Sequence, residues 1–115
     1  MMQAVTTIPN SMPEVQTTIT HQLSLPRLCP ATGNPQPGSE IRISYSPAAL
    51  LLDVFGLEAL LAGYVGHTEI RDIEYMVQHL TQRCADALAV EVQAEAGVLL
   101  DLGQHLTIAT HARPV

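Results

Sequence analysis

Hydrophobic and polar residues alternate in four stretches of the chain, as they do in strands that bury one face. Residues 14–25 and 40–45 alternate on either side of a loop, and predict an antiparallel pair with a broad connection. Residues 88–96 and 98–110 alternate again near the end of the chain. Gly97 between them is typical of a hairpin turn, and Gly103 predicts a bulge.

Between the two strand pairs, apolar residues repeat with helical spacing. Ser46 followed by Pro47 is typical of a helix start, and predicts a first helix over residues 47–64. A second helix is expected from a cap at Thr68 to residue 88, with Glu69 and Asp72 in its first turn, where the helix dipole favours acids. Its apolar stripe consists of Ile70, Ile73, Val77, Leu80, Cys84, Ala87 and Leu88.

The order strand, strand, helix, helix, strand, strand indicates an α+β fold. Each helix has one face to bury, so the simplest arrangement lays both across one side of a four-stranded antiparallel sheet. Residues 1–13 are small and polar, with two prolines, and predict a flexible N-terminal tail; residues 14–115 then form a single domain. Such a sheet has open edges, and pairing with another copy would cover them, so we expect a homo-oligomer.

The charge balance narrows the possible functions. Eleven acidic residues stand against five arginines, with no lysine, and give a formal net charge of −6. This composition argues against binding to a nucleic-acid backbone, and the missing lysine excludes a P-loop or a Schiff-base lysine. Two cysteines are too few for a secreted disulfide framework, and neither a leader nor a membrane span is evident. We therefore expect a cytoplasmic protein.

Cys29 has the setting that most favours chemistry. It opens the loop Cys-Pro-Ala-Thr-Gly-Asn-Pro at residues 29–35, where prolines restrict the backbone while Gly33 and Asn34 tolerate left-handed conformations. Such a loop can aim a thiol, and nearby backbone N–H groups and the Thr32 hydroxyl can donate to a thiolate. Packing is the competing interpretation, and it is the one expected for Cys84.

Two further residues are candidates for contact with a ligand. Glu74, off the apolar stripe of the second helix, could hold the N–H edge of a purine-like ligand, or simply be solvated beside Arg71 or Gln78. His67, in the turn between the helices, could donate to a ligand or transfer protons, or merely be exposed. No other cysteine or histidine stands near Cys29 at zinc-ligand spacing, so no metal is expected.

Residues 28–35, Leu-Cys-Pro-Ala-Thr-Gly-Asn-Pro, and the strand Ile-Arg-Ile-Ser-Tyr at 41–45 resemble the QueF-type 7-cyano-7-deazaguanine (nitrile) reductases. The similarity spans about residues 23–111. That family, which acts in queuosine biosynthesis and hence tRNA modification, has the tunnelling fold, with the same order of elements. The resemblance implies that Cys29 adds to the substrate nitrile as a covalent thioimide, which NADPH reduces. It also implies that Glu74 anchors the deazaguanine ring, and that subunits form a ring or larger oligomer around ligand pockets.

The chain departs from that family at two functional positions. Gln36 stands where the family has an aspartate as proton donor; an amide can bind substrate but cannot deliver a proton, which leaves His67 or a water for that role. Residues 51–56 have no counterpart of the Glu-Ser-Lys stretch linked to NADPH. A shorter branch, which forms amidines from ammonia and a tRNA-borne deazapurine nitrile, also lacks that stretch, and Gly-Tyr-Val-Gly at 63–66 is similar to it.

Three functions follow from these observations. The first is a QueF-like nitrile reductase with Cys29 and His67 as catalytic residues, and with Thr32, Gln36 and Glu74 in substrate binding. The second is an amidine-forming enzyme that acts on a deazapurine nitrile. The third is a non-catalytic protein that binds a deazapurine or pterin. In each case a small heterocycle and further copies of the chain are the expected partners.

Overall fold

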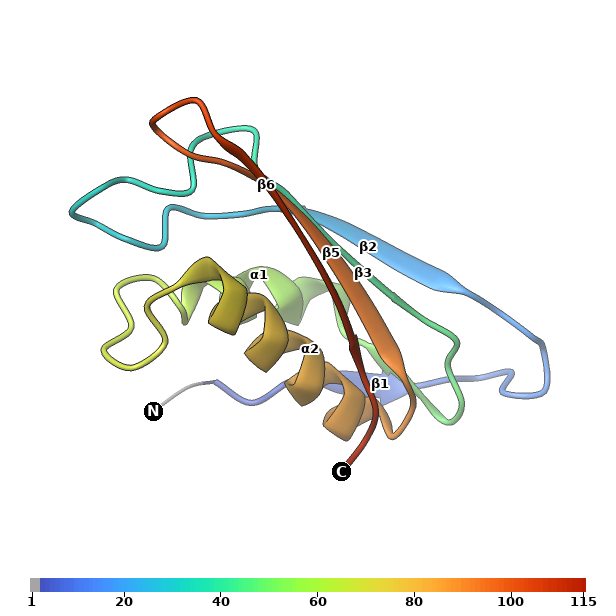
Figure 1. The fold of residues 1–115 in the computed structure, drawn as a ribbon. Helices are drawn as coiled ribbons and strands as arrows, with labels where there is room; N and C mark the ends of the chain where they lie inside the picture. The colour runs from blue at the N-terminus through green and yellow to red at the C-terminus, as the bar shows by residue number, and fades with distance from the viewer. Residues whose placement is uncertain (1–2) are drawn as a thin grey trace.

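The computed structural model describes residues 3–115, which form two helices and two antiparallel sheets (Figure 1). The larger sheet has the strand order β2-β3-β5-β6, and the smaller one pairs β1 with β4. This confirms the expected α+β class and the four-stranded antiparallel sheet. The elements are β1 (Thr7–Pro9), β2 (Ile19–Ser24), β3 (Glu40–Tyr45), β4 (Leu50–Leu52), α1 (Val54–Ala62), α2 (Ile73–Leu88), β5 (Val92–Leu99) and β6 (His105–Ala112).

Strands β3 and β5 form the centre of the large sheet and bury one face each. The bounds of β3 are those expected from its alternation, and Ile41, Ile43 and Tyr45 are at most 4% exposed. Their partners in β5 are equally buried, since Ile43 lies opposite Ala94 and Tyr45 opposite Val92. Both helices lie on this side of the sheet (Figure 1), and α2 packs on β5 and β6 through residues of its apolar stripe, Val77, Leu80, Cys84 and Leu88.

The C-terminal hairpin turns at residues 100–104, so the expectation of a turn at Gly97 was wrong. Gly97 lies inside β5, between Glu40 of β3 and Thr107 of β6. The burial alternation continues past it to Val98, which favours continued pairing over a turn. Gly103, expected at a bulge, instead lies in the turn with φ of 76°, a conformation that glycine adopts without steric cost.

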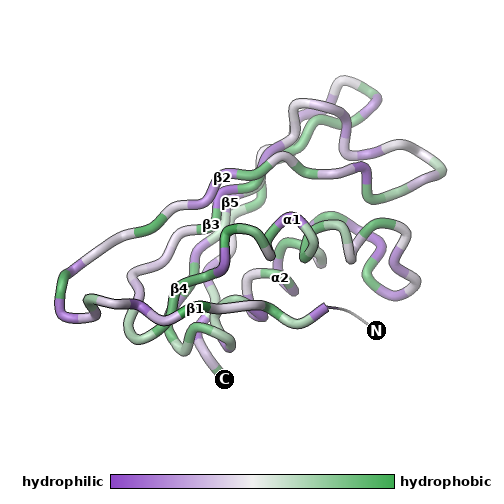
Figure 2. The backbone as a smooth tube through the Cα atoms, turned by 180° about the vertical axis from the view of Figure 1, so that it is seen from behind, coloured by the Kyte–Doolittle hydropathy of each residue, from purple (hydrophilic) through white to green (hydrophobic). Residues whose placement is uncertain are grey.

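The first helix begins later than its sequence indicated. The apolar run after Pro47 is first extended, because Leu50–Leu52 pairs with Thr7–Pro9 as a two-stranded sheet. Asp53 then caps α1 by accepting a hydrogen bond from the Phe55 N–H at 3.1 Å. Figure 2 shows the mostly apolar colouring of α1, whose inner residues are buried against the rest of the fold. A local pattern of apolar residues does not separate a buried strand from a helix.

The second helix also begins later, at Ile73 rather than after Thr68. Asp72 is its N-cap, and the carboxylate accepts from the Tyr75 N–H at 2.6 Å. Residues 63–72 therefore form a connection with no regular structure, longer than expected. Among residues 3–115, neither helix is long and apolar enough to cross a membrane.

The N-terminal segment, expected to be a flexible tail, contains β1 and lies against the start of α1. The Asp53 N–H donates to the Thr6 carbonyl at 3.0 Å, and the Asn10 N–H donates to the Ala49 carbonyl at 2.8 Å. Contact with α1 is close, because a Cβ on Gly56 would lie 2.1 Å from Thr6 Oγ1. Pairing with β4 thus gives backbone partners to a segment whose own sequence predicts none.

Replacing Gly56 by alanine tests this docking, because the contact with Thr6 decides whether the substitution raises or lowers the stability of the protein. In a helix without such a neighbour, alanine in place of glycine stabilises by about 1 kcal/mol. Here we expect the free energy of unfolding, measured by urea denaturation, to fall by roughly 1–3 kcal/mol, since the added methyl group must displace Thr6.

The double variant Thr6→Ala, Gly56→Ala is expected to recover the free energy of unfolding that Gly56→Ala loses, because the Thr6 hydroxyl is removed. Gly97→Ala is the matched control, because no atom lies within 4 Å of the added Cβ. If Gly56→Ala alone increased stability, the N-terminal segment would not be docked on α1.

Candidate functional site

Two loops meet beyond one end of the large sheet and enclose a cleft of about 540 Å³. One connects β2 to β3 and the other connects α1 to α2; Figure 1 shows them side by side, in cyan and yellow. The Gly66 N–H donates to the Leu28 carbonyl at 2.9 Å and joins the loops directly. The cleft is lined by residues 28–31 on one side and 66–68, 70 and 71 on the other. It therefore brings Cys29 and His67 into one site.

The loop that carries Cys29 is closed by its own backbone. The Leu28 and Cys29 N–H groups both donate to the Asn34 carbonyl, at 2.9 and 3.0 Å, and the Gly33 N–H donates to the Cys29 carbonyl at 2.8 Å. Gly33 makes this closure possible, because its φ of 70° is unfavourable for residues with a side chain. Cys29 is thus held at the start of a tight, hydrogen-bonded loop.

This closed loop is fastened to the β5–β6 hairpin. Asn34 Oδ1 accepts from the Asp101 N–H at 3.0 Å, while Asn34 Nδ2 donates to the Asp101 carboxylate at 3.2 Å. The Gln36 N–H donates to the Leu99 carbonyl at 2.8 Å, and its side-chain amide donates to the Gly33 carbonyl and to Asn34 Oδ1. Gln36 therefore braces the loop and does not line the cleft.

The environment of Cys29 favours the thiolate. The Thr32 hydroxyl has the largest effect in lowering the pKa of the Cys29 thiol, followed by the backbone N–H groups of Thr32 and Ala31. Partial burial opposes this shift, and the positive charge of Arg71 adds to it. Cys84, in contrast, is fully buried in α2, and burial raises its pKa to about 12. Of the two thiols, only the half-buried Cys29 is suited to act as a nucleophile.

His67 is fixed in the cleft by hydrogen bonds to one ring nitrogen. Its Nδ1 accepts from the Glu69 N–H at 3.1 Å and from the Ile70 N–H at 3.0 Å. A neutral imidazole in this arrangement carries its proton on Nε2. His67 therefore lines the cleft as a hydrogen-bond donor.

Of the remaining predicted site residues, Thr32 acts on the cleft through Cys29, whereas Glu74 lies outside the cleft. Thr32 lies beside Cys29 and acts on its pKa. Glu74 is exposed in the first turn of α2 and does not line the cleft. Arg71, considered from the sequence only as a possible partner of Glu74, lines the cleft instead. Sequence spacing along a helix could not reveal this, because Arg71 precedes the helix.

A partly buried polar cluster around Tyr64, at the start of the 63–72 connection, was also missed. Tyr64 is 1% exposed, with its hydroxyl 2.8 Å from His79 Nδ1, and Arg83 donates to that hydroxyl and to the Gln3 carbonyl. Burial lowers the pKa of His79 and raises that of Tyr64. The cluster joins the end of α1 to α2 and so supports the 63–72 connection. His79 and Arg83 stand four residues apart on the helix, and this spacing indicated that their side chains could lie side by side. No pattern in the sequence connected Tyr64 with them.

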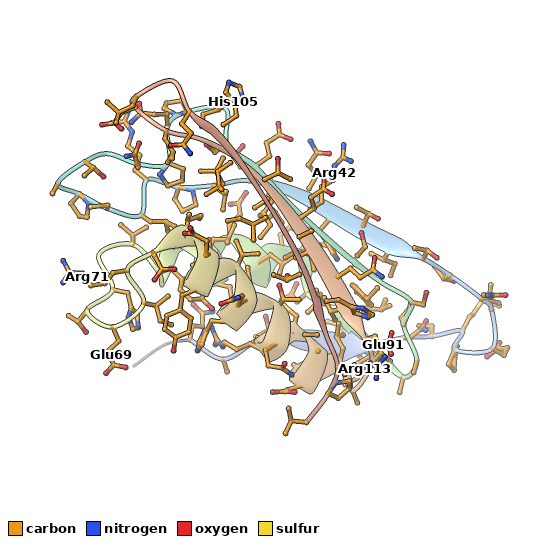
Figure 3. All side chains as sticks on the ribbon, viewed as in Figure 1. Arg42, Glu69, Arg71, Glu91, His105 and Arg113 are labelled. Carbon is orange, nitrogen blue, oxygen red and sulfur yellow. The ribbon has the colours of Figure 1, made fainter. Side chains whose placement is uncertain are left out.

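Another hollow, of about 430 Å³, lies on the face of the large sheet that points away from the helices. Arg42, which Figure 3 shows on that side, lines it together with Glu95 and other polar residues. No cysteine lines this hollow, and its charges are mixed. Within residues 3–115, no three His, Cys, Asp or Glu side chains converge as metal ligands do. We therefore place the candidate site at the Cys29 cleft.

The role of Thr32 can be tested by the pH dependence of alkylation. The thiolate is the reactive form, so a lowered pKa means that Cys29 reacts at lower pH than a free cysteine. In Thr32→Val we expect the midpoint of the rate profile to move to higher pH, whereas Thr32→Ser should keep it low. Iodoacetamide labelling followed by peptide mass spectrometry separates Cys29 from Cys84. A Thr32→Val midpoint equal to that of the wild type would contradict this assignment.

Comparison with known proteins adds no identification. A scan against models of protein families and a search of curated protein sequences returned no match to this chain.

Proposed function

We propose that the Cys29 cleft binds a nitrile-bearing 7-deazaguanine and captures it as a covalent thioimide, as the resemblance to QueF-type reductases implies. The observation that supports this proposal is a half-buried thiol with a lowered pKa in the wall of a cleft. A nitrile carbon is a suitable electrophile, because a thiolate can add to it without displacing a leaving group. Such a thiol must stay reduced, so a cytoplasmic setting is part of the proposal.

In the proposed step, the Cys29 sulfur forms a bond to the nitrile carbon and one carbon–nitrogen π bond breaks. The nitrogen takes up a proton from solvent water, and all atoms of the ligand remain in the adduct. His67 lines the same cleft, and its Nε2–H would donate a hydrogen bond to the nitrogen as negative charge develops there.

NADPH, which the family resemblance implies as reductant, does not fit the corresponding segment of this chain. The Leu52 N–H donates to the Tyr45 hydroxyl at 2.8 Å, and Asp53 caps α1, so the polar groups here hold the fold. No cationic side chain occurs in residues 51–56 to meet the 2′-phosphate. The proposed mechanism accordingly contains no hydride transfer.

Capture without turnover is the second candidate function, and the position of Gln36 favours it. The family has a proton-donating aspartate at this point, whereas the Gln36 amide donates to the Gly33 carbonyl and to Asn34 Oδ1. Such an amide stabilises the loop but supplies no proton for a catalytic cycle. An amidine-forming reaction would replace the reductant with ammonia and start from the same thioimide.

Self-association completes the proposal. Strands β2 and β6 are the edges of the large sheet, and each offers backbone groups to a second copy of the chain. A tunnelling-fold ring would use these edges and would add walls to the open cleft. The anchoring role proposed for Glu74 requires such an extension, because this residue lies outside the cleft of a single chain.

Covalent capture predicts a specific adduct. We expect the protein, mixed with 7-cyano-7-deazaguanine, to gain the full mass of the ligand on the peptide that contains Cys29, together with a near-ultraviolet thioimide absorbance. Both signals should be absent in Cys29→Ala and unchanged in Cys84→Ala, because Cys84 is buried. Lack of an adduct at saturating ligand would remove the covalent step.

The anchoring role of Glu74 is tested separately, in a Cys29→Ala background that permits only non-covalent binding. We expect Glu74→Ala to weaken 7-cyano-7-deazaguanine binding by roughly tenfold or more, the size expected for loss of a charge-assisted hydrogen-bond pair. Gln78→Ala, also on the exposed side of α2, is the control. Equal dissociation constants, measured by calorimetry, would exclude this role for Glu74.

A further inference from the structure

We infer that the ligand of the Cys29 cleft carries a phosphate group that Arg71 binds, as in a nucleoside 5′-monophosphate. This inference rests on the proposed use of the cleft as a ligand site, but it does not depend on the nitrile chemistry. It names the charged part of the ligand, which the resemblance to deazaguanine reductases leaves open.

The lining of the cleft is positively charged, although the chain as a whole is acidic. The whole sequence has a formal net charge of −6, yet the lining contains Arg71 and no aspartate or glutamate. The acidic neighbours of Arg71 are directed elsewhere: Asp72 caps α2, and Figure 3 shows the side chain of Glu69 pointing away from that of Arg71. A negatively charged group can therefore approach Arg71 without opposing carboxylates in the cleft.

The guanidinium of Arg71 is available to a ligand. The ion pairs among residues 3–115 join Glu91 to His111 and to Arg113, at the far end of the sheet from Arg71. Within the same described residues, Arg71 makes neither an ion pair nor a side-chain hydrogen bond. A free guanidinium presents paired N–H donors that match two oxygens of a phosphate group. Its charge also reaches Cys29, whose thiol pKa it helps to lower.

The other polar groups of the cleft can also donate to an acceptor. His67 carries its free N–H on Nε2, and the Thr68 hydroxyl lines the same wall. A guanine-like ring presents N–H groups that need acceptors, whereas Glu74, the carboxylate expected to supply them, is outside the lining. A phosphate dianion presents only acceptors, so it matches these donors more closely than the ring edge does.

The size and charge of the cleft favour a small phosphate ester over a nucleic-acid strand. A strand presents repeated phosphates and requires several cations along its path, but Arg71 is the one arginine in the lining. The volume of about 540 Å³ lies within the range of sites for small molecules. A nucleoside monophosphate would place its phosphate at Arg71 and its ring along the remaining walls.

Protection of Cys29 from alkylation tests the inference without any nitrile. The rate constant for iodoacetamide labelling of Cys29 is measured at fixed pH on the full chain, with GMP, guanosine or inorganic phosphate, and with sodium chloride to equalise ionic strength. We expect GMP to protect Cys29 at lower concentration than guanosine, and phosphate to protect it more than chloride does. In Arg71→Gln the concentration of GMP needed should rise roughly tenfold or more, which is the loss expected for one charge-assisted pair.

Arg71→Lys should retain part of the protection, since it keeps the charge and loses the paired geometry. Arg42→Gln, on the opposite face of the sheet, is the control and should protect as the wild type does. Because Arg71 is exposed, its replacement is not expected to unfold the chain. The changes in the amide chemical shifts of residues 67–71 on addition of GMP give a second measurement of binding. Equal protection by GMP and guanosine, no protection at all, or unchanged protection in Arg71→Gln would overturn the inference.

The two proposals can fail separately. A thioimide adduct together with equal protection by GMP and guanosine would keep nitrile capture and remove the phosphate site. Protection that depends on Arg71, with no adduct from 7-cyano-7-deazaguanine, would keep the phosphate site and remove nitrile capture.

Discussion

Burial of one face of β3 and β5 beneath the two helices is the constraint on which the rest of this structure depends. Alternation in these strands places Ile41, Ile43, Val92 and Val98 on the same side of the sheet, where both helices lie. Helix α2 packs on β5 and β6 there through its apolar residues. Each of the four strand residues is at most 1% exposed, so truncating any of them would leave a cavity at a cost of a few kcal/mol. Because a slip of one residue would turn this face to solvent, the buried face also fixes the register of the central strands.

That register determines where the loops lie. Once β3 is paired with β5, the loop before β3 and the turn after β5 must leave the sheet at the same end, and there Asn34 meets Asp101 and Gln36 meets Leu99. The connection between the helices reaches the same end, and Gly66 joins it to Leu28. The candidate site is therefore built from loops, on a frame of strands that does not itself contribute a cleft residue.

The chemistry of the cleft combines a thiolate-stabilising loop with donors from the opposite wall. Thr32 and two backbone N–H groups favour ionised Cys29, while His67 and Arg71 face the same space from the other loop. This arrangement suits addition of sulfur to an electrophilic carbon in a ligand that also carries negative charge. Gln36 is committed to the loop by its hydrogen bonds to Gly33 and Asn34, and its amide supplies no proton to the cleft.

Sequence alone determined the features that arise from local periodicity and local backbone chemistry. It predicted the α+β class, the bounds of β3, the buried positions Val77, Leu80, Cys84 and Leu88 of α2, and the loop that presents Cys29. Alternation, helical spacing and the glycine and proline positions act over a few residues, so local sequence records them. Only the tertiary structure decided the rest. Leu50–Leu52 became a strand because the distant residues Thr7–Pro9 pair with it, and Gly97 stayed in β5 because β3 and β6 flank it on both sides. Arg71 joined Cys29, and Glu74 did not, because the approach of two loops is fixed by contacts between residues far apart in the chain, which no local pattern records.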